Sequence, residues 1–380
     1  MSDINKETIL NALEATAMNG EPPARLASLL DVGTADYLAY FKREVIEGLT
    51  AGGGSTCRFY EGPYGSGKTH MLELLEEMAL AEGMVVVRTD LSSDLRLEDS
   101  QAVTQYIMQN MKIDINGQMV RSLPNILEMW GESNPSESAK LTGTYLSHPG
   151  YKKAMAMALQ PDQVSERGWL LLRAFLQGEK VTVAELKRAG IVGIKGPLNQ
   201  RNAEIVLKTI IEGLNLIGIP GIMLLFDENE RTLQPNRSKP TKKQLVAANL
   251  MRHLIDGCTN GNLPRTVVAF AILPGFLETT AVHYQALGQR LAMVRDVNMS
   301  GAWRWPVLSL EEVNTAGEPE DFLEQAIDKL CAMVDQCGGN SFGLADKMKN
   351  AGMRVFQENA GVGYKRDLIK ILCSLSLQYC

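Results

Sequence analysis

The chain is expected to fold as an α/β protein with a parallel sheet, and the order and apolar pattern of its segments carry this prediction. Residues 56–61, 69–82 and 84–90 read as strand, helix and strand, a spacing that predicts a right-handed βαβ unit. The runs 222–227 and 267–273 are short and apolar, as expected of strands buried on both faces of a parallel sheet. Helical patterns fill much of the remainder, so we expect helices to cover the sheet.

The helical patterns divide the chain into sections. Residues 1–55 are expected to form an N-terminal helical arm, and residues 56–310 the core that contains the sheet. Within the core, the segment of about 100–203 reads as helical and is expected to be an insertion that covers or flanks the main site. Residues 311–380 read as helices only and predict a C-terminal helical lid. Individual helices are expected at 7–17, 34–49, 98–112, 151–158, 169–176, 183–189, 204–216 and 244–256, and a last core strand at 305–310.

The most informative segment follows the first strand. Residues 62–69 read Gly-Pro-Tyr-Gly-Ser-Gly-Lys-Thr and fit the Gly-x-x-x-x-Gly-Lys-Thr pattern of a phosphate-binding P-loop. Glycines let backbone N–H groups surround phosphate oxygens, and the N-terminus of the following helix favours negative charge. Lys68 is expected to reach the β- and γ-phosphates, and the Thr69 hydroxyl to bind Mg²⁺. The predicted nucleotide-binding residues are Gly62, Pro63, Tyr64, Gly65, Ser66, Gly67, Lys68, Thr69 and His70.

A second acidic motif predicts hydrolysis of the bound nucleotide. Residues 222–228 read Ile-Met-Leu-Leu-Phe-Asp-Glu, so a buried strand ends on two carboxylates. Asp227 is placed to hold the Mg²⁺ shell, and Glu228 to orient or deprotonate the attacking water. The Asp-Glu pair favours an ATPase over a small-molecule kinase. We see no Asn/Thr-Lys-x-Asp loop for reading guanine at a suitable place, so ATP is the expected nucleotide and the core is expected to be a P-loop NTPase.

Composition limits the other classes of function. The chain has 380 residues and a net charge of −6, which gives no global attraction to nucleic acid, so any such contact needs a local basic patch. No apolar run approaches the roughly 20 residues of a membrane span, so no membrane contact is expected. The 6 cysteines form no Cys-x-x-Cys pair and the 4 histidines complete no zinc pattern. Reduced thiols in a cytoplasmic protein are therefore expected.

These motifs also carry a family resemblance. The order of P-loop, Asp-Glu strand, further strand and helical tail resembles AAA+ ATPases near the replication-initiator and STAND branch. More narrowly, the chain resembles the BREX-type, BrxD-like ATP-binding proteins of bacterial anti-phage defence, with Shango-type defence ATPases as close relatives. The stretches that carry this resemblance are PPAR at 22–25 with VG at 32–33, FYEGPYGSGKTH at 59–70, VVVRTDLS at 85–92, FLQGE at 175–179, LLFDENE at 224–230 and GYKRDLI at 363–369.

The resemblance implies further residues and partners. Arg366 matches a second-sensor arginine that reaches the phosphates from the helical lid, and Arg290 is the first candidate for an arginine finger that acts on a neighbouring subunit, with Arg295 second. The strand after the acidic motif ends Ile-Leu-Pro at 272–274, where the family normally has a polar sensor. Either Thr279 or Thr280 substitutes for that sensor, or γ-phosphate sensing is weakened. Implied partners are other subunits of a defence operon, such as a helicase or nuclease, as well as further copies of the chain and double-stranded DNA.

Three functional hypotheses stay open at this stage. In the first, ATP binding orders an assembly of a defence complex and hydrolysis resets it. In the second, the chain is a nucleotide-gated scaffold that hydrolyses little, which the missing polar sensor favours. In the third, it is a DNA-loading or DNA-translocating motor. The negative net charge and the lack of a recognisable DNA-reading segment argue against this third hypothesis. The basic stretch 239–243 is expected to be a solvated loop, and Trp303 and Trp305 are expected to pack in the core or at an interface.

Overall fold

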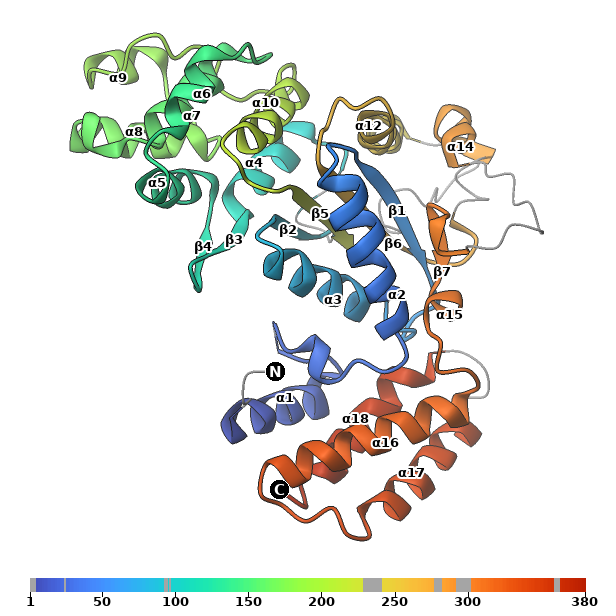
Figure 1. The fold of residues 1–380 in the computed structure, drawn as a ribbon. Helices are drawn as coiled ribbons and strands as arrows, with labels where there is room; N and C mark the ends of the chain where they lie inside the picture. The colour runs from blue at the N-terminus through green and yellow to red at the C-terminus, as the bar shows by residue number, and fades with distance from the viewer. Residues whose placement is uncertain are drawn as a thin grey trace.

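A mixed sheet forms the centre of the molecule (Figure 1). The computed structural model describes residues 5–23, 25–91, 95, 97–227, 241–276, 282–291, 302–358 and 363–380. Within these residues, seven strands pair in the order β4-β3-β2-β5-β6-β1-β7. All pairs from β2 to β7 are parallel, and β3 and β4 add an antiparallel hairpin at one edge. The strands are β1 Thr56–Glu61, β2 Val85–Asp90, β3 Lys112–Ile115, β4 Gln118–Arg121, β5 Ile222–Asp227, β6 Thr266–Ile272 and β7 Val307–Ser309.

The central strands are buried on both faces, as the sequence predicted. Every residue of β5 and of β6 is buried. Because side chains alternate along a strand, Leu224 and Phe226 of β5 enter the core on one face, and Met223 and Leu225 enter the core on the other. This double burial explains why the strand reads as a continuous apolar run rather than as an alternating one. The predicted α/β class is confirmed.

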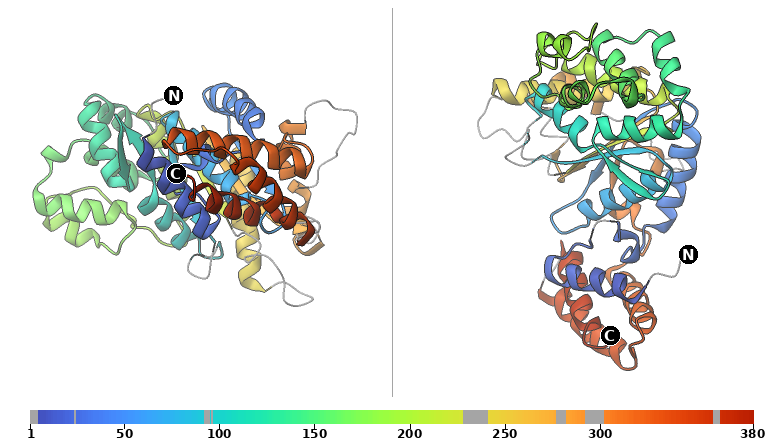
Figure 2. Two further views of the ribbon diagram at one scale, coloured as in Figure 1. Left: turned by 90° about the horizontal axis from the view of Figure 1, so that it is seen from below. Right: turned by 90° about the vertical axis from the view of Figure 1, so that its left-hand side faces the viewer.

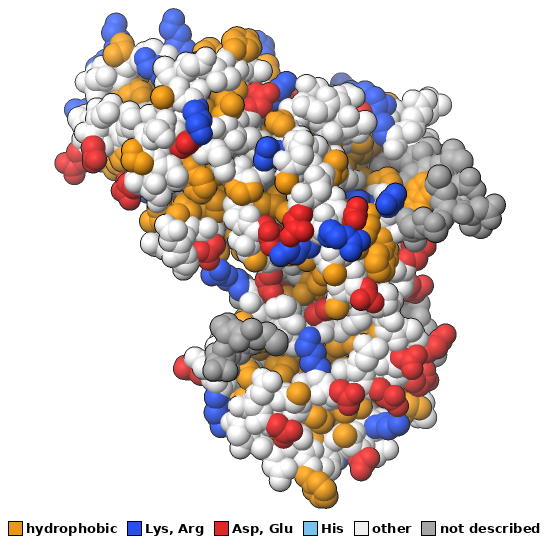
Figure 3. Space-filling model, in the orientation of Figure 1, with side chains coloured by type: hydrophobic (Ala, Val, Ile, Leu, Met, Phe, Trp, Pro, Cys, Tyr) orange, Lys and Arg blue, Asp and Glu red, His pale blue; other side chains and the backbone are white. Residues whose placement is uncertain are grey.

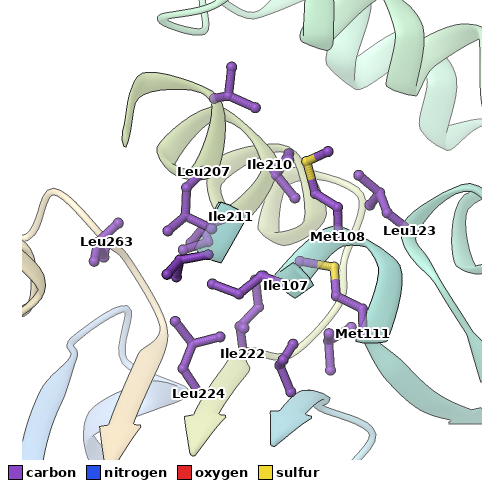
Figure 4. Close-up of a cluster of buried hydrophobic side chains, with 14 of the residues drawn as sticks. Ile107, Met108, Met111, Leu123, Leu207, Ile210, Ile211, Ile222, Leu224 and Leu263 are labelled. Carbon is purple, nitrogen blue, oxygen red and sulfur yellow. The ribbon is translucent and has the colours of Figure 1, made fainter. Parts of the chain in front are cut away.

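Helices cover the two faces of the sheet. In Figure 4, Ile107 of α4 and Ile211 of α10 meet Ile222 and Leu224 of β5, so the apolar stripes of these helices close the core on that face. On the opposite face lie α3 and the long helix formed by α2 and the π-helical segment that continues it. The helices beside the sheet are α2 Ala35–Tyr40 with its continuation Phe41–Thr50, α3 Lys68–Ala81, α4 Ser100–Asn110, α10 Ala203–Leu216, α12 Lys242–Thr259 and α14 Gln285–Leu291.

The segment between β2 and β5 contains more than the expected helices. The β3–β4 hairpin lies inside the stretch that was expected to be helical, and this hairpin was not predicted. Its turn is Asn116-Gly117, with φ of 54° and 83°, the left-handed pair that a two-residue hairpin turn requires. Helix α5 Leu123–Ser133 packs on this hairpin, and the helices after it stand away from the sheet at the upper left of Figure 1. They are α6 Glu137–Gly143, α7 Pro149–Ala158, α8 Glu166–Leu176 and α9 Val183–Arg188, with the short turn Pro161–Gln163 between α7 and α8.

The C-terminal helices form a separate cluster below the sheet, and the first helix of the chain packs with them (Figure 2). Ile9 and Leu13 of α1 are buried among residues of this cluster, whereas Tyr37 and Phe41 are buried under the sheet. The segment expected to be one N-terminal arm therefore contributes to two cores, while its boundary and that of the lid stay predictions. The elements here are α1 Lys6–Asn19, the short turn Ala27–Leu29, α15 Leu310–Val313, α16 Pro319–Gln336, α17 Leu344–Glu358 and α18 Tyr364–Ser376, with the turn Ala302–Arg304 before β7.

A search of the described residues finds no helix with the length and apolar character needed to cross a bilayer.

Aromatic rings join α2 to β1 and to the turn before β7. The Tyr37 ring lies 5.8 Å from the Trp303 ring and 6.1 Å from the Tyr60 ring, measured between centroids. The hydroxyl oxygens of Tyr37 and Tyr60 lie 2.6 Å apart, and both side chains are fully buried. Trp303 thus packs against the core, as the sequence led us to expect.

We predict that Tyr37→Phe lowers the free energy of unfolding by about 1–3 kcal/mol, because it leaves the buried Tyr60 hydroxyl without its partner. The double variant Tyr37→Phe/Tyr60→Phe should lose less unfolding free energy than the two single variants combined, because removing both hydroxyls leaves no buried hydroxyl without a partner. Urea unfolding followed by circular dichroism measures this, with Tyr40→Phe as the control. Additive losses in the double variant would contradict the hydrogen bond.

Candidate functional site

The glycine-rich loop connects β1 to α3 at the carboxyl end of the parallel strands, where α/β proteins bind their ligands. Gly67 is the N-cap residue of α3 and has φ of 98°, and Gly65 has φ of 75°. Both values belong to the left-handed region that residues with a Cβ adopt at a cost. The chain can therefore turn back sharply and direct its N–H groups inward only because glycines stand at these two positions.

The Lys68 side chain lies inside this loop and bonds to its backbone. Its Nζ donates to the carbonyl oxygens of Gly62 at 2.8 Å and of Pro63 at 3.0 Å, and lies 5.2 Å from the centroid of the Tyr64 ring. The side chain is buried, so the ammonium group is fixed by the loop itself. A positive charge at this place lies where the phosphate chain of a nucleotide would be surrounded by the loop.

Two oxygen ligands of the kind that Mg²⁺ prefers meet at the start of α3. The Thr69 hydroxyl donates to Oδ2 of Asp227 at 2.8 Å, although the residues are separated by most of the insertion. Asp227 is the last residue of β5, and the parallel pairing of β5 with β2 and β6 brings its carboxylate to the level of the loop. A hydroxyl and a carboxylate this close fit a divalent cation with oxygen ligands. The two predicted metal residues are thus adjacent.

A half-buried arginine near Asp227, Arg88, was missed by the sequence analysis. Nη2 of Arg88 lies 4.0 Å from Oδ2 of Asp227, and its Nη1 lies 2.7 Å from Oε1 of Glu73 on α3. Burial raises the pKa of Glu73, and the bond to Arg88 opposes that rise. The guanidinium therefore links the Asp227 carboxylate to the first turns of α3. The available signal was a charged residue within an otherwise apolar strand, Val-Val-Val-Arg-Thr-Asp at 85–90.

A cavity of about 220 Å³ opens beside the loop, with walls from three parts of the chain. The loop and the start of α3 form one wall, the segment after α1 forms the second, and α15, α16 and α18 supply the third. Polar groups lie at the loop end and also on the other two walls, where Glu21, Asn314 and Arg366 border the cavity. Apolar side chains line it as well, namely Leu30, Val32, Met71, Leu310, Phe322 and Ile369. A cavity that combines an apolar lining with convergent polar groups is typical of a small-molecule site.

The C-terminal helices touch the loop through backbone. Gly363, the N-cap residue of α18, has φ of 88°, and a Cβ there would lie 2.3 Å from the Tyr64 carbonyl oxygen. A Cβ at Gly65 would lie 2.4 Å from the carbonyl oxygen of Gly363. Such distances do not occur for real Cβ atoms. The lid and the loop can approach this closely only because both positions are glycine.

Arg366 lines the same cavity from α18. Its Nη2 donates to the carbonyl oxygen of Asn19 at 2.9 Å and lies 3.5 Å from Oε1 of Glu21. The arginine is therefore held by the segment after α1, at the edge of the cavity that the loop closes. This location is near the predicted one, and its role stays a prediction.

His70, the last of the predicted binding residues, also borders the cavity. Its Nε2 lies 4.0 Å from Oδ1 of Asp31. The pKa of His70 is lowered to about 4, mainly by burial and to a smaller extent by the charge of Lys329, while the Asp31 carboxylate opposes the change. The imidazole is therefore neutral near neutral pH, in a position between α3, the segment after α1 and α16.

Arg290 lies away from this site. Its Nε is 2.5 Å from Oδ1 of Asp256, and its Nη1 donates to the carbonyl oxygen of Ala286 at 2.9 Å. It borders a different hollow, together with Cys57 near the start of β1, whereas the glycine-rich loop follows the end of that strand. A direct contact with a nucleotide in the same subunit is thus excluded by position. The other sequence-predicted residues, Glu228, Thr279, Thr280 and Arg295, lie outside the described residues, as do positions 239 and 240 of the basic stretch 239–243. The remainder of that stretch was expected to be a loop, but Thr241 is the N-cap residue of α12 and Lys242 is its first residue.

A parallel sheet, a glycine-rich loop before α3 and a carboxylate from β5 beside the first threonine of α3 together define a P-loop NTPase-like protein. The chain belongs to the family of BREX system ATP-binding proteins BrxC/D, whose family model matches residues 1–160 and 153–317. This match confirms the BrxD-like resemblance. The chain is thus an ATP-binding protein of a BREX anti-phage defence system, and that membership implies other defence subunits as partners. No curated protein matches the chain.

We predict that Gly363→Ala weakens ATP binding, because the new Cβ would push α18 away from the Tyr64 carbonyl oxygen. Gly343→Ala is the matched control, since Gly343 has a similar φ of 75° but a Cβ there would meet nothing within 4 Å. Both variants should lose about 1 kcal/mol of stability from the left-handed backbone. Only Gly363→Ala should raise the Kd for ATP in calorimetric titration, and equal Kd values in the two variants would contradict the lid contact.

We also predict an acid-sensitive contribution from His70. Its folded-state pKa is about 4, below the ordinary value of about 6.5, so the unfolded state takes up the proton first as the pH falls. Stability is therefore unaffected above pH of about 6.5 and is lost toward pH 4, by at most about 1.4 kcal/mol per pH unit. Relative to His70→Gln, the wild type should lose roughly 1 kcal/mol in unfolding free energy between neutral pH and about one unit below the ordinary pKa. Parallel profiles would show that this imidazole is not buried.

Proposed function

We propose that the chain is a Mg²⁺-dependent ATPase whose cycle drives assembly or conformational change of a multi-protein anti-phage defence complex. The observation that carries this proposal is the bond of 2.8 Å between the Thr69 hydroxyl and Asp227, beside a P-loop whose lysine is already in place. ATP binding, which the family description states, needs only the phosphate-binding loop. The acidic strand end next to Thr69 is the part that supports metal-assisted chemistry.

The roles in this proposal follow from position. Lys68 exchanges its bonds with Gly62 and Pro63 for the β- and γ-phosphates, and the Thr69 hydroxyl and the Asp227 carboxylate become metal ligands. When bound, Mg²⁺ neutralises charge on the phosphate oxygens. Residue 228 directly follows Asp227, and its carboxylate is proposed to orient and deprotonate the attacking water.

Two arginines are proposed to complete the site. Arg366 can turn from Asn19 and Glu21 toward the phosphates, since it already borders the cavity. Arg290 is proposed to act on the nucleotide of a neighbouring copy, with Arg295 as the second candidate. The partly exposed side chain of Arg290 and its distance from the loop of its own chain are compatible with action between subunits. Self-association, location in the cytoplasm and contact with double-stranded DNA belong to the same proposal.

The nucleotide-gated scaffold remains a second candidate because of one observation. The strand β6 ends at Ile272 and is followed by Leu273 and Pro274, so the described part of this strand end offers no side chain that can bond to a γ-phosphate. A protein with the binding groups but a weakened sensor would bind ATP, close the lid and hydrolyse slowly. Turnover of the purified protein separates the two candidates.

We predict that Lys68→Ala abolishes ATP binding and that Glu228→Gln retains binding but lowers turnover about 100-fold or more, the usual contribution of a general base. Phosphate release measures turnover, and calorimetry measures binding in the same preparations. Turnover should also disappear when Mg²⁺ is removed by chelation. If the wild type binds ATP but turns it over no faster than Glu228→Gln, the hydrolysis assignment is wrong and the scaffold is the better description.

A further inference from the structure

Charge is distributed unevenly between the helical insertion and the remainder of the chain. Residues 137–202 contain ten of the 38 Lys and Arg residues but only five of the 44 Asp and Glu residues. This stretch therefore carries a net charge of +5 within a chain whose net charge is −6. In Figure 3, Lys and Arg side chains stand out along the upper edge of the molecule, where α6 to α9 lie in Figure 1.

Part of this charge follows one segment that runs from the last turn of α9 to the start of α10. Lys187, Arg188, Lys195 and Arg201 are all exposed and follow one another along it. We name this segment, residues 187–201, the basic loop. Ser165 at the N-cap of α8 donates to the carbonyl oxygen of Ala189 at 3.3 Å, so the loop begins on the amino end of α8.

The basic loop then crosses α7. A Cβ at Gly150 would lie 2.0 Å from the carbonyl oxygen of Lys195, and a Cβ at Gly193 would lie 2.6 Å from Nζ of Lys153. Lys153 on α7 and the exposed Arg167 in the first turn of α8 therefore flank the basic loop. The four basic side chains of the basic loop thus lie on a segment that contacts the two helices carrying Lys153 and Arg167.

Three glycines shape this surface. Gly190, Gly193 and Gly196 recur at every third position, with φ values of 84°, 83° and 70°. Gly190 and Gly193 are exposed, and no atom lies within 4 Å of the place that a Cβ of Gly190 would occupy. An exposed backbone without Cβ atoms lets an extended anionic chain approach closely between the basic side chains.

Among the described residues, no carboxylate lies within ion-pair distance of these six side chains. The acid nearest in sequence to Arg188 is Glu185, which instead accepts hydrogen bonds from the Thr182 N–H and hydroxyl groups at 2.8 and 2.7 Å. A solvated helix face in an acidic protein would be expected to alternate charges of both signs. The Thr182 hydrogen bonds and, to a lesser extent, the charge of Arg188 lower the pKa of Glu185, so Arg188 is close enough to this acid to interact with it. Within the described residues, none of the six basic side chains forms an ion pair.

We propose that the basic loop, with Lys153 and Arg167, binds the phosphate backbone of nucleic acid. This inference specifies where the double-stranded DNA named above as a proposed partner binds, and it holds whether or not the chain hydrolyses ATP. An acidic protein is the less suitable partner, because the large apolar side chains exposed on the basic loop and on the helices beside it are aliphatic, namely Leu170, Val183 and Val192. Protein interfaces usually bury an apolar, aromatic-rich centre, whereas phosphate recognition needs mainly Lys, Arg and backbone.

The test is the salt dependence of DNA binding by the full-length chain. The probe is a fluorescently labelled duplex of about two helical turns and arbitrary sequence, titrated between about 50 and 200 mM salt. With up to six phosphate contacts, the slope of log K against log salt should be about −5 for the wild type. Lys187→Gln/Arg188→Gln/Lys195→Gln should weaken binding and reduce the magnitude of that slope by about 2.7, because each lost phosphate contact removes about 0.9.

The matched control is Lys347→Gln/Lys349→Gln/Arg354→Gln, which removes the same charge from exposed positions on α17 at the other end of the molecule (Figure 1). Its slope should equal that of the wild type, and both triple variants should bind ATP normally, which shows that they are folded. ATP turnover measured without DNA reports on the proposed function separately.

Three outcomes would overturn the inference. The first is a wild-type chain that binds neither duplex nor single-stranded DNA at the lowest salt concentration. The second is a basic-loop variant whose affinity and slope match those of the α17 control. The third is displacement of the duplex by polyglutamate of equal total charge as effectively as by unlabelled DNA, which would identify an acidic protein as the partner. Displacement by unlabelled DNA alone supports the phosphate backbone as the ligand.

Discussion

The bond between the Thr69 hydroxyl and the Asp227 carboxylate is the constraint on which the remainder of the structure depends. It requires that β5 lie parallel to its neighbours and end at the level at which α3 begins, which the registers of β5 with β2 and β6 provide. Asp227 is far from Thr69 in the sequence, and the long insertion lies between them. The insertion must therefore begin and end at the sheet in a way that leaves the strand register unchanged. It does so through α4 and α10, whose apolar side chains pack on the strands that flank the site.

The second important constraint is the closeness of the lid to the phosphate loop. Gly65 and Gly363 bring two backbone segments into direct contact, and α1 packs on α18 while the segment after α1 holds Arg366. The first and last helices of the chain therefore share one core beside the cavity. The backbone contact between Gly363 and the loop joins that core to the phosphate loop.

Much of the fold and of the site could be predicted from local sequence, because the P-loop, the Asp227 strand and the buried strands carry patterns in adjacent residues. Sequence reasoning did not find the β3–β4 hairpin, whose Asn116-Gly117 turn lay within a stretch interpreted as helical. It also missed Arg88, because the link of this side chain to Glu73 and Asp227 joins three separate elements. Arg290 and Arg366 were selected by resemblance, and their positions depend on long-range packing that no local pattern encodes.

The two edges of the sheet have a consequence for how this protein can associate. At one edge β4 has four residues, Gln118–Arg121, and at the other β7 has three, Val307–Ser309. Strands this short present few unpaired backbone groups, so they offer a poor template for an added strand from another chain. Within the described residues, a partner protein is therefore expected to bind to helical faces and side chains rather than to add a strand to the sheet. The short edge strands also disfavour aggregation by edge-to-edge strand pairing.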